Sequence, residues 1–196
     1  MRFDEPTRTA IRSRLDALSR RALTQTSPRA AVLVPLCHEG GQASILFTKR
    51  TDTVGTHKGQ VSFPGGRMDD DDKDEVDCAL RELEEELGID RSRVEVLGRF
   101  HEVMSITGVR VTPVIAFIDD VTLLTPAPAE IEAVFTLSIE DLLDPRKCEM
   151  RPLRSGMRGP FYTAGPHPVW GLTAFILDDV LRDALALTLP NREVVQ

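Results

Sequence analysis

The stretch DEVDCALRELEEELGI, residues 74–89, has the spacing of an amphipathic helix that packs on a sheet. Its apolar side chains follow one another by four, three and four residues, which places them along one side of an α-helix. Gly88 stands where a left-handed cap is expected to end the helix. We therefore predict a helix over residues 74–87, with an apolar stripe formed by Val76, Leu80, Leu83 and Leu87.

The same helix gathers three carboxylates on another side. Glu82, Glu85 and Glu86 stand at i, i+3 and i+4, so their side chains are neighbours on one helix surface. Like charges at this spacing repel one another, and a hard divalent cation such as Mg²⁺ offsets that repulsion through oxygen ligands. Arg81 begins the cluster and is placed to pair with Glu85. The alternative is a solvated acidic face, which is common on helices.

Elements on both sides of this helix alternate between strands and turns. Upstream, we expect a hairpin of residues 30–36 and 43–50 around Gly40–Gly41, a polar loop at 51–58, and a short strand at 60–63 before Pro64-Gly65-Gly66. The remaining expectations are helices at 5–25, 139–143 and 170–185, long strands at 94–103, 109–118 and 131–137, and a hairpin of 149–153 with 161–164. This order indicates an α/β protein with helices packed on a mixed sheet.

Composition narrows the class of protein. The 196 residues are 41% hydrophobic and 28% charged with a net charge of −7, which predicts one globular domain over residues 1–196 and argues against binding to nucleic acid. No apolar run approaches the ~20 residues that span a bilayer, and no secretion signal is evident, so no membrane association is expected. Three scattered cysteines, Cys37, Cys78 and Cys148, fit reduced thiols in the cytoplasm.

Residues 66–89 resemble the Nudix box. Arg81–Ile89 fills every defined position of its second half, REUxEExGU, where U is apolar. The first half departs, because Asp72 stands at the usual glutamate position and lies one residue too far from Arg81. A box lengthened in this way resembles the coenzyme A pyrophosphatase subgroup, which also carries LLTxR and GxxxFPGG. Here those segments read Leu46–Arg50 and Gly59–Gly66, with Phe47, Thr51 and Gly55 as departures, and two later segments are also similar, Val109–Pro113 and Trp170–Ala174.

The resemblance implies a Nudix α/β/α sandwich with a mixed β-sheet. It implies Glu82 and Glu86 as the main metal ligands, with Glu85 beside them as ligand or base, and Arg81 as the residue that orients the carboxylates. Gly65 and Gly66 would form the loop before the catalytic helix. The implied cofactor is Mg²⁺, with Mn²⁺ able to replace it, and the implied reaction is hydrolysis of coenzyme A to 4'-phosphopantetheine and adenosine 3',5'-bisphosphate.

Substrate contacts and the general base are expected outside the glutamate cluster. Five basic residues flank the glycine turn, and a diphosphate substrate is expected to contact at least one or two of them: Lys49, Arg50, His57, Lys58 and Arg67. Each taken singly also fits a solvated loop charge. His101, Glu102 and Glu130 are further candidates for a base. Two other functions stay open, namely hydrolysis of another substrate such as ADP-ribose, a dinucleotide or a nucleoside triphosphate, and ligand sensing or protein binding without turnover.

Overall fold

A computed structural model describes residues 1–52, 59–153, 156 and 158–190. The helices are α1 (Glu5–Ala17), α2 (Glu75–Leu87), the 3₁₀ turn η1 (Arg91–Arg93), α3 (Ile139–Leu143), α4 (Gly171–Asp179) and the π-helical η2 (Val180–Ala184). The strands are β1 (Arg29–Glu39), β2 (Gln42–Arg50), β3 (Val61–Ser62), β4 (Gly65–Arg67), β5 (Val94–Arg99), β6 (Val103–Met104), β7 (Arg110–Ile118), β8 (Ile131–Ser138), β9 (Cys148–Pro152) and β10 (Arg158–Tyr162).

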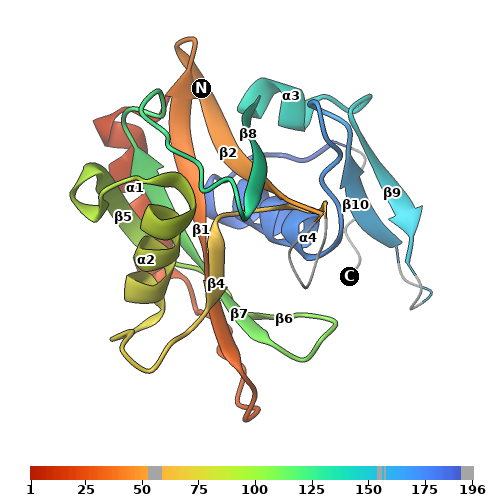
Figure 1. The fold of residues 1–196 in the computed structure, drawn as a ribbon. Helices are drawn as coiled ribbons and strands as arrows, with labels where there is room; N and C mark the ends of the chain where they lie inside the picture. The colour runs from red at the N-terminus through yellow and green to blue at the C-terminus, as the bar shows by residue number, and fades with distance from the viewer. Residues whose placement is uncertain (53–58, 154–155, 157, 191–196) are drawn as a thin grey trace.

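The main sheet is mixed. Its central order is β3-β2-β1-β7-β5, with β8 paired to β2, β4 to β1, and β6 to β7. β1 runs parallel to β7, whereas β1 and β2 form the predicted antiparallel hairpin, in which Glu39 faces Gln42 across the Gly40–Gly41 turn. β9 and β10 form a separate antiparallel hairpin to one side (Figure 1). The predicted α/β class is confirmed.

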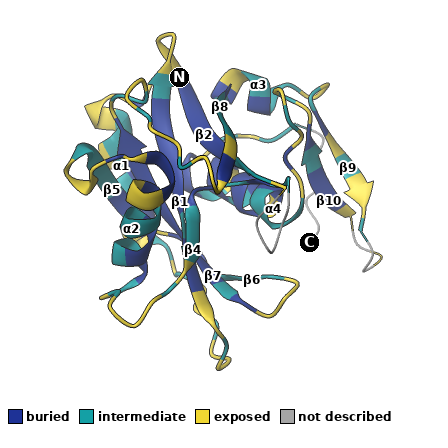
Figure 2. Ribbon diagram, in the orientation of Figure 1, coloured by how far each residue is buried: buried dark blue, intermediate teal, exposed yellow. Residues whose placement is uncertain are grey.

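Helices cover both faces of the sheet (Figure 1). Ala31 and Leu33 of β1 pack with α2, while Val34 and Leu36 contribute to the core shared with α1 and α4. This division follows from the strand geometry, because successive side chains point to opposite faces. Since helices bury both faces, the central strands are almost continuously apolar, and they are the most buried elements in Figure 2.

Two short strands fill a gap in the sheet in front of α2. β1 and β2 pair only near their hairpin turn, at Leu36–Glu39 and Gln42–Ile45. Farther from the turn, β4 pairs with Ala30–Val32 of β1, and β3 pairs with Thr48–Lys49 of β2. Leu33 also donates its backbone N–H to the Pro64 carbonyl at 2.8 Å. This arrangement holds the glycine turn between two central strands and beside α2.

The C-terminal end of α2 follows the predicted signal, and an aspartate caps its N-terminal end. Asp74 caps the first turn by accepting hydrogen bonds from the backbone N–H groups of Val76 at 2.9 Å and Asp77 at 3.0 Å. Gly88 ends the helix with φ of 67°, a left-handed conformation that favours glycine. The predicted apolar stripe is rotated slightly. Leu83 and Leu87 are fully buried, but the positions that join them in the core are Cys78 and Ala79 rather than Val76 and Leu80, which are half-buried.

The prediction of one helix over residues 5–25 is wrong beyond Ala17. Leu18 already has extended backbone angles, and Ala22 is exposed rather than part of an apolar stripe. The chain after the helix is instead held by the segment that follows β5. The backbone carbonyl of Arg21 accepts from the Glu102 N–H at 3.0 Å, and the Arg21 N–H donates to Nδ1 of His101 at 3.0 Å. These long-range contacts replace the hydrogen bonds that would continue α1.

The predicted long strand over 94–103 is divided into β5 and β6. Both pair with β7, but the ladder is interrupted opposite Pro113 of β7, which has no N–H to donate. Two other boundaries also shift. The helix predicted over 170–185 is α-helical only to Asp179 and continues as the π-helix η2, and the hairpin predicted at 149–153 and 161–164 forms from Cys148–Pro152 and Arg158–Tyr162.

Candidate active site

Arg81 is the centre of an ion-pair network on α2. Its guanidinium donates to both carboxylate oxygens of Asp72 at 2.9 Å, and its Nη1 lies 3.0 Å from Glu82 and 3.1 Å from Glu85. Its Nη2 also donates to the Arg67 carbonyl at 3.2 Å. The bidentate pairing lowers the pKa of Asp72 to about 2. Asp72 therefore holds Arg81 in place despite the longer spacing between them.

Glu82 lies directly against the glycine turn. A methyl group at Gly66 would stand 2.4 Å from Oε1 of Glu82, so only glycine leaves room for this carboxylate. Burial raises the pKa of Glu82, and its contact with Arg81 opposes that shift. One turn earlier, the buried thiol of Cys78 lies 3.8 Å from the Gly66 carbonyl and 3.6 Å from the Arg67 carbonyl. The turn and the helix are thus packed closely at this point.

Glu86 is the most buried of the three glutamates, with 3% of its side chain exposed. Its two oxygens accept from different parts of the chain, Oε1 from the guanidinium of Arg50 at 3.3 Å and Oε2 from the Gly65 N–H at 3.3 Å. Burial raises the pKa of Glu86 to about 8, Arg50 opposes this, and the charges of Glu82 and Glu130 add to it. A buried carboxylate among other carboxylates is stabilised by a nearby cation.

Glu85 lies differently from its two neighbours. Its side chain is 59% exposed and is directed to Arg81. Within the described ranges, no three His, Cys, Asp or Glu side chains converge as a metal-binding group. The site nevertheless fits a magnesium ion, which commonly uses one or two carboxylates and completes its shell with water and substrate phosphate. Glu82 and Glu86 are all-oxygen donors on one helix surface beside a turn that a single added carbon would fill.

The segment before β8 is attached to the end of α2. The N–H groups of Thr125 and Ala127 donate to the carbonyls of Leu87 and Glu86, each at 2.9 Å. This attachment places Glu130 with its carboxylate 3.7 Å from Arg50. Of the three candidate bases, Glu130 is therefore the one that lies beside the cluster.

His101 and Glu102 have other partners. Both are buried, and both hold the chain that follows α1. Glu102 accepts from the Leu23 N–H at 2.6 Å, and its carboxylate lies 3.7 Å from Arg110. His101 Nδ1 accepts from the Arg21 N–H, and burial lowers its pKa. We assign these two side chains to the attachment of the N-terminal segment.

Only some of the residues expected to contact substrate lie beside the glutamates of α2. Gly65 and Gly66 lie against Glu86 and Glu82, as described, and Arg50 is joined to Glu86. Lys49 is paired with Glu132 of β8 at 2.5 Å rather than with one of the three glutamates. The Arg67 side chain is exposed, and it is the carbonyl of this residue that contacts Arg81. His57 and Lys58 lie outside the described residues. Nothing in the sequence pattern indicated that Arg50 would join the carboxylates, because its partner Glu86 is 36 residues away.

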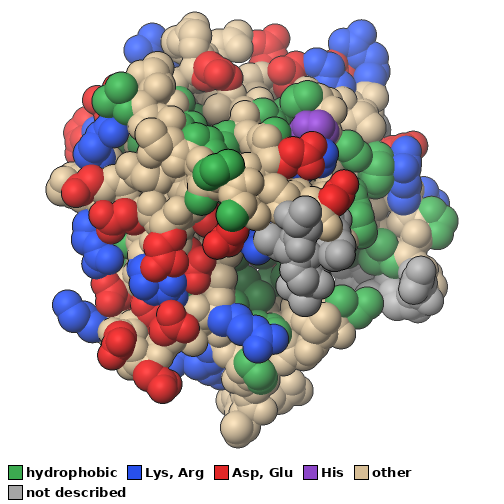
Figure 3. Space-filling model, viewed as in Figure 1, with side chains coloured by type: hydrophobic (Ala, Val, Ile, Leu, Met, Phe, Trp, Pro, Cys, Tyr) green, Lys and Arg blue, Asp and Glu red, His purple; other side chains and the backbone are tan. Residues whose placement is uncertain are grey.

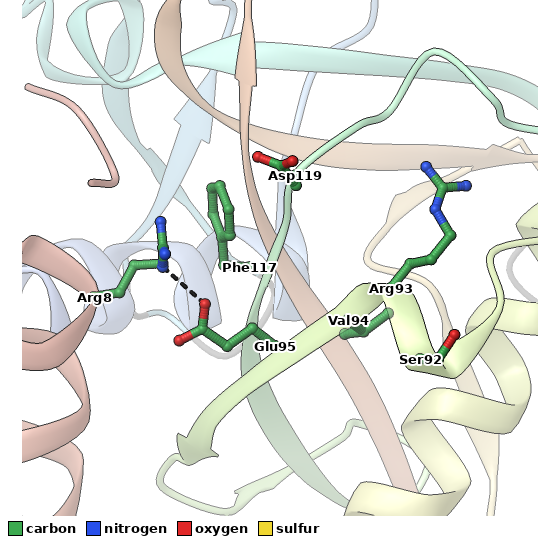
Figure 4. A pocket seen from close by; sticks show the side chains of 7 residues that line it. All are labelled: Arg8, Ser92, Arg93, Val94, Glu95, Phe117 and Asp119. Atoms are coloured by element: carbon green, nitrogen blue, oxygen red, sulfur yellow. Dashed lines mark ion pairs between the residues drawn. The ribbon is translucent and has the colours of Figure 1, made fainter. Parts of the chain in front are cut away.

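Charged side chains mark this region on the surface. Figure 3 shows acidic and basic side chains gathered over α2 and β4, with the surface hollowed beside them. A different hollow of about 360 Å³ lies between α1, β5 and the end of β7 and contains none of the predicted site residues (Figure 4). There Arg8 is paired with Glu95 at 2.8 Å and lies over the Phe117 ring, so its charge is already neutralised. We place the functional site at α2.

Replacing Gly66 with alanine is expected to lower activity without unfolding the protein. The added carbon meets only the end of the Glu82 side chain, which can turn away from the site. A displaced ligand of this kind is expected to cost roughly 10- to 100-fold in kcat. Gly65→Ala is the contrasting variant, because its added carbon would lie 2.3 Å from the Ala31 carbonyl and should lower the melting temperature. Normal kcat in Gly66→Ala would show that Glu82 need not occupy this place.

Comparison with known proteins identifies relatives over most of the chain. The NUDIX domain family matches residues 27–155. Mitochondrial coenzyme A diphosphatase NUDT8 of Mus musculus is 39% identical over 160 residues, which cover 78% of this chain and 76% of that protein. The Homo sapiens protein of the same name is 40% identical over 162 residues, covering 78% and 68%.

A solved structure has the same fold. The Nudix hydrolase RenU from M. Smegmatis aligns with a TM-score of 0.53 at 21% identity, covering 85% of this chain and 91% of that one. The likeness confirms the predicted sandwich with its mixed sheet. The interpretation of residues 1–196 as one domain stays a prediction. Within the described residues, each helix is too short or too polar to cross a lipid bilayer.

Proposed function

This chain belongs to the Nudix hydrolase family, and from that membership we propose that it hydrolyses the diphosphate of coenzyme A or of a coenzyme A derivative, with Mg²⁺ as its cofactor. Nudix hydrolases use divalent metal ions, and the oxygen-only ligand set on α2 favours Mg²⁺, which Mn²⁺ can replace. The observation that carries the proposal is the position of Glu82 and Glu86, which meet the Gly65–Gly66 turn from one helix surface. The products are adenosine 3',5'-bisphosphate and 4'-phosphopantetheine.

Coenzyme A is favoured over other diphosphates by two lines of support. The relatives named as coenzyme A diphosphatases are 39% and 40% identical to this chain. Three residues of the segments Leu46–Arg50 and Gly59–Gly66, which carry the resemblance to that subgroup, also lie at the proposed site: Arg50 contacts Glu86, and Gly65 and Gly66 contact the carboxylates. The positions of Arg50, Gly65 and Gly66 therefore support a link between this signature and the proposed site.

The site residues have separate tasks in this proposal. Glu82 and Glu86 hold the cation, which when bound stabilises negative charge on the phosphoryl oxygens and makes a water easier to deprotonate. Arg81 orients Glu82 and Glu85 while Asp72 fixes Arg81. We assign to Glu85, the exposed member, the task of accepting a proton from water. The water oxygen forms a new bond to one phosphorus, the bridging P–O bond breaks, and the second phosphate leaves.

A substrate panel tests the assignment. Purified protein with Mg²⁺ should release adenosine 3',5'-bisphosphate from coenzyme A, and we expect kcat/KM for coenzyme A to exceed that for ADP-ribose, a dinucleotide and a nucleoside triphosphate. Chromatographic separation of products measures all four reactions under one set of conditions. A panel in which ADP-ribose leads and coenzyme A is among the poorest substrates would leave the Nudix assignment in place and reject this substrate. Absence of turnover on every member would favour a ligand-binding function.

A further inference from the structure

Arg50 at the end of β2 lies between two carboxylates. Its Nη1 is 3.3 Å from Oε1 of Glu86, and its Nη2 is 3.7 Å from Oε2 of Glu130. Only 21% of the Arg50 side chain is exposed. Both ends of the guanidinium fork are thus directed at protein groups, although the sequence pattern had suggested a contact with substrate. A planar guanidinium can join two anions in this way because its donors are held in a fixed geometry.

Backbone hydrogen bonds connect the segments that carry Arg50, Glu86 and Glu130. Thr51, the residue that follows β2, donates its N–H to the Glu130 carbonyl at 2.9 Å, which fixes the position of Glu130 beside the end of β2. Ala127 donates its N–H to the Glu86 carbonyl at 2.9 Å, so α2 fixes the same segment from the other side. The Gln60 carbonyl accepts from the Arg50 N–H at 3.1 Å. Arg50, Glu86 and Glu130 therefore come from β2, α2 and the segment before β8, whose main chains are joined at the point where the side chains meet.

An irregularity in the sheet coincides with Arg50. The pairing of β2 with β8 shifts register between Lys49, which faces Ala133, and Arg50, which faces Ile131. A bulge of this kind bends the strand locally and changes the direction of a side chain, and bulges are frequent beside active sites. Lys49, on the regular side of the shift, pairs instead with Glu132 at 2.5 Å. Two adjacent basic residues thus have different acidic partners.

We propose that Arg50 is a positioning residue that bridges Glu86 and Glu130 and holds the two carboxylates at the spacing the site requires, rather than binding substrate. The proposal rests on the proposed function for its catalytic consequence, because Glu86 is there a ligand of the cation. Without the guanidinium, the negative charge that Glu86 carries as a cation ligand would face that of Glu130, and the two carboxylates would move apart. The expected consequence is a poorly formed cation site, with substrate binding largely preserved.

The central test uses Arg50→Met with Lys49→Met as its matched control. Both changes remove one cation from an ion pair, and the two side chains are similarly exposed, at 21% and 19%. Arg50→Met should lower kcat by roughly 10- to 100-fold, the usual cost of losing a residue that orients metal ligands, while KM for coenzyme A changes less than about threefold. Lys49→Met should retain kcat within about twofold. The kcat of Arg50→Lys should lie between those of wild type and Arg50→Met, because one ammonium group cannot reach both carboxylates.

A second readout does not depend on turnover. Binding of Mn²⁺ to the full chain without substrate, followed by electron paramagnetic resonance, should weaken at least about fivefold in Arg50→Met and stay unchanged in Lys49→Met. If Arg50 were a substrate contact, its removal would raise KM at least about tenfold and leave both kcat and Mn²⁺ binding unchanged, and that result would overturn the proposal.

Thermal unfolding separates this proposal from the proposed function. Arg50→Met, Glu130→Gln and the double variant form a cycle in which residues that act as one unit give non-additive losses. We expect the decrease in melting temperature of the double variant to be clearly smaller than the sum of the decreases of the two single variants. Should the wild-type protein hydrolyse none of the substrates, the cycle and Mn²⁺ binding still decide the bridging role. Strictly additive losses would contradict it whatever the enzyme acts on.

Discussion

Replacing Glu86 with glutamine is expected to lower kcat by about 10³-fold, because a cation that stabilises phosphoryl charge lowers the activation barrier by several kcal/mol and Glu86 is its most buried proposed ligand. Glutamine has nearly the same shape and can still accept from the Gly65 N–H. Its neutral oxygen is a much weaker ligand for a hard cation. Initial rates of coenzyme A hydrolysis across a range of Mg²⁺ concentrations measure the effect.

The same variant should keep its stability. The folded-state pKa of Glu86 is raised to about 8, above its ordinary value of 4.5, so the charged form is disfavoured in the folded protein at neutral pH. Removing that charge should leave the melting temperature without Mg²⁺ unchanged or higher, whereas the stabilisation by added Mg²⁺ should disappear. Glu84→Gln is the control on the same helix, since that side chain is 47% exposed and lies 3.8 Å from Arg91. Near-normal activity in Glu86→Gln would remove Glu86 from the proposed site.

Replacing Glu75 with glutamine is expected to cost about 3 kcal/mol of unfolding free energy at pH 7. Only 7% of the Glu75 side chain is exposed, and its carboxylate joins Arg29 of β1 to Arg99 of β5, the latter at 3.0 Å. Burial raises its pKa, but a hydrogen bond from its own backbone N–H, together with the hydrogen bonds of Arg29 and Arg99 and the charge of Arg29, more than compensates and lowers it to about 2. For a chain of this length, the melting temperature should fall by roughly 6–12 °C.

The stability lost in Glu75→Gln should become smaller as the pH falls. The folded-state pKa of Glu75 is below its ordinary value of 4.5, so its stabilising contribution is complete above about pH 4.5 and is lost as the pH falls toward about 2. The difference in melting temperature between wild type and Glu75→Gln should therefore narrow on acidification. Glu140→Gln is a matched control, because Glu140 is also in the first turn of a helix but is exposed. A gap that stays constant from pH 7 to pH 3 would contradict the ion-pair explanation.

The sequence by itself determined helix α2 and the grouping of its glutamates on one surface. Spacing of four, three and four residues, a capping aspartate and a terminal glycine are local signals, and they act through hydrogen bonds within a few residues. The β1–β2 hairpin follows for the same reason, since two glycines form the turn between two apolar strands. The Arg81–Glu85 pair is also local, because the two residues stand one helical turn apart.

Only the tertiary structure decided how the three glutamates differ. Glu82, Glu85 and Glu86 are equivalent by spacing, yet one lies against Gly66, one is exposed to solvent, and one is buried beside Arg50. The end of α1 was decided in the same way, by contacts between Arg21 and residues 101–102. Periodicity reports which residues share a surface, but burial and charge depend on what covers that surface. Those partners come from strands and loops far along the chain, so no local pattern specifies them.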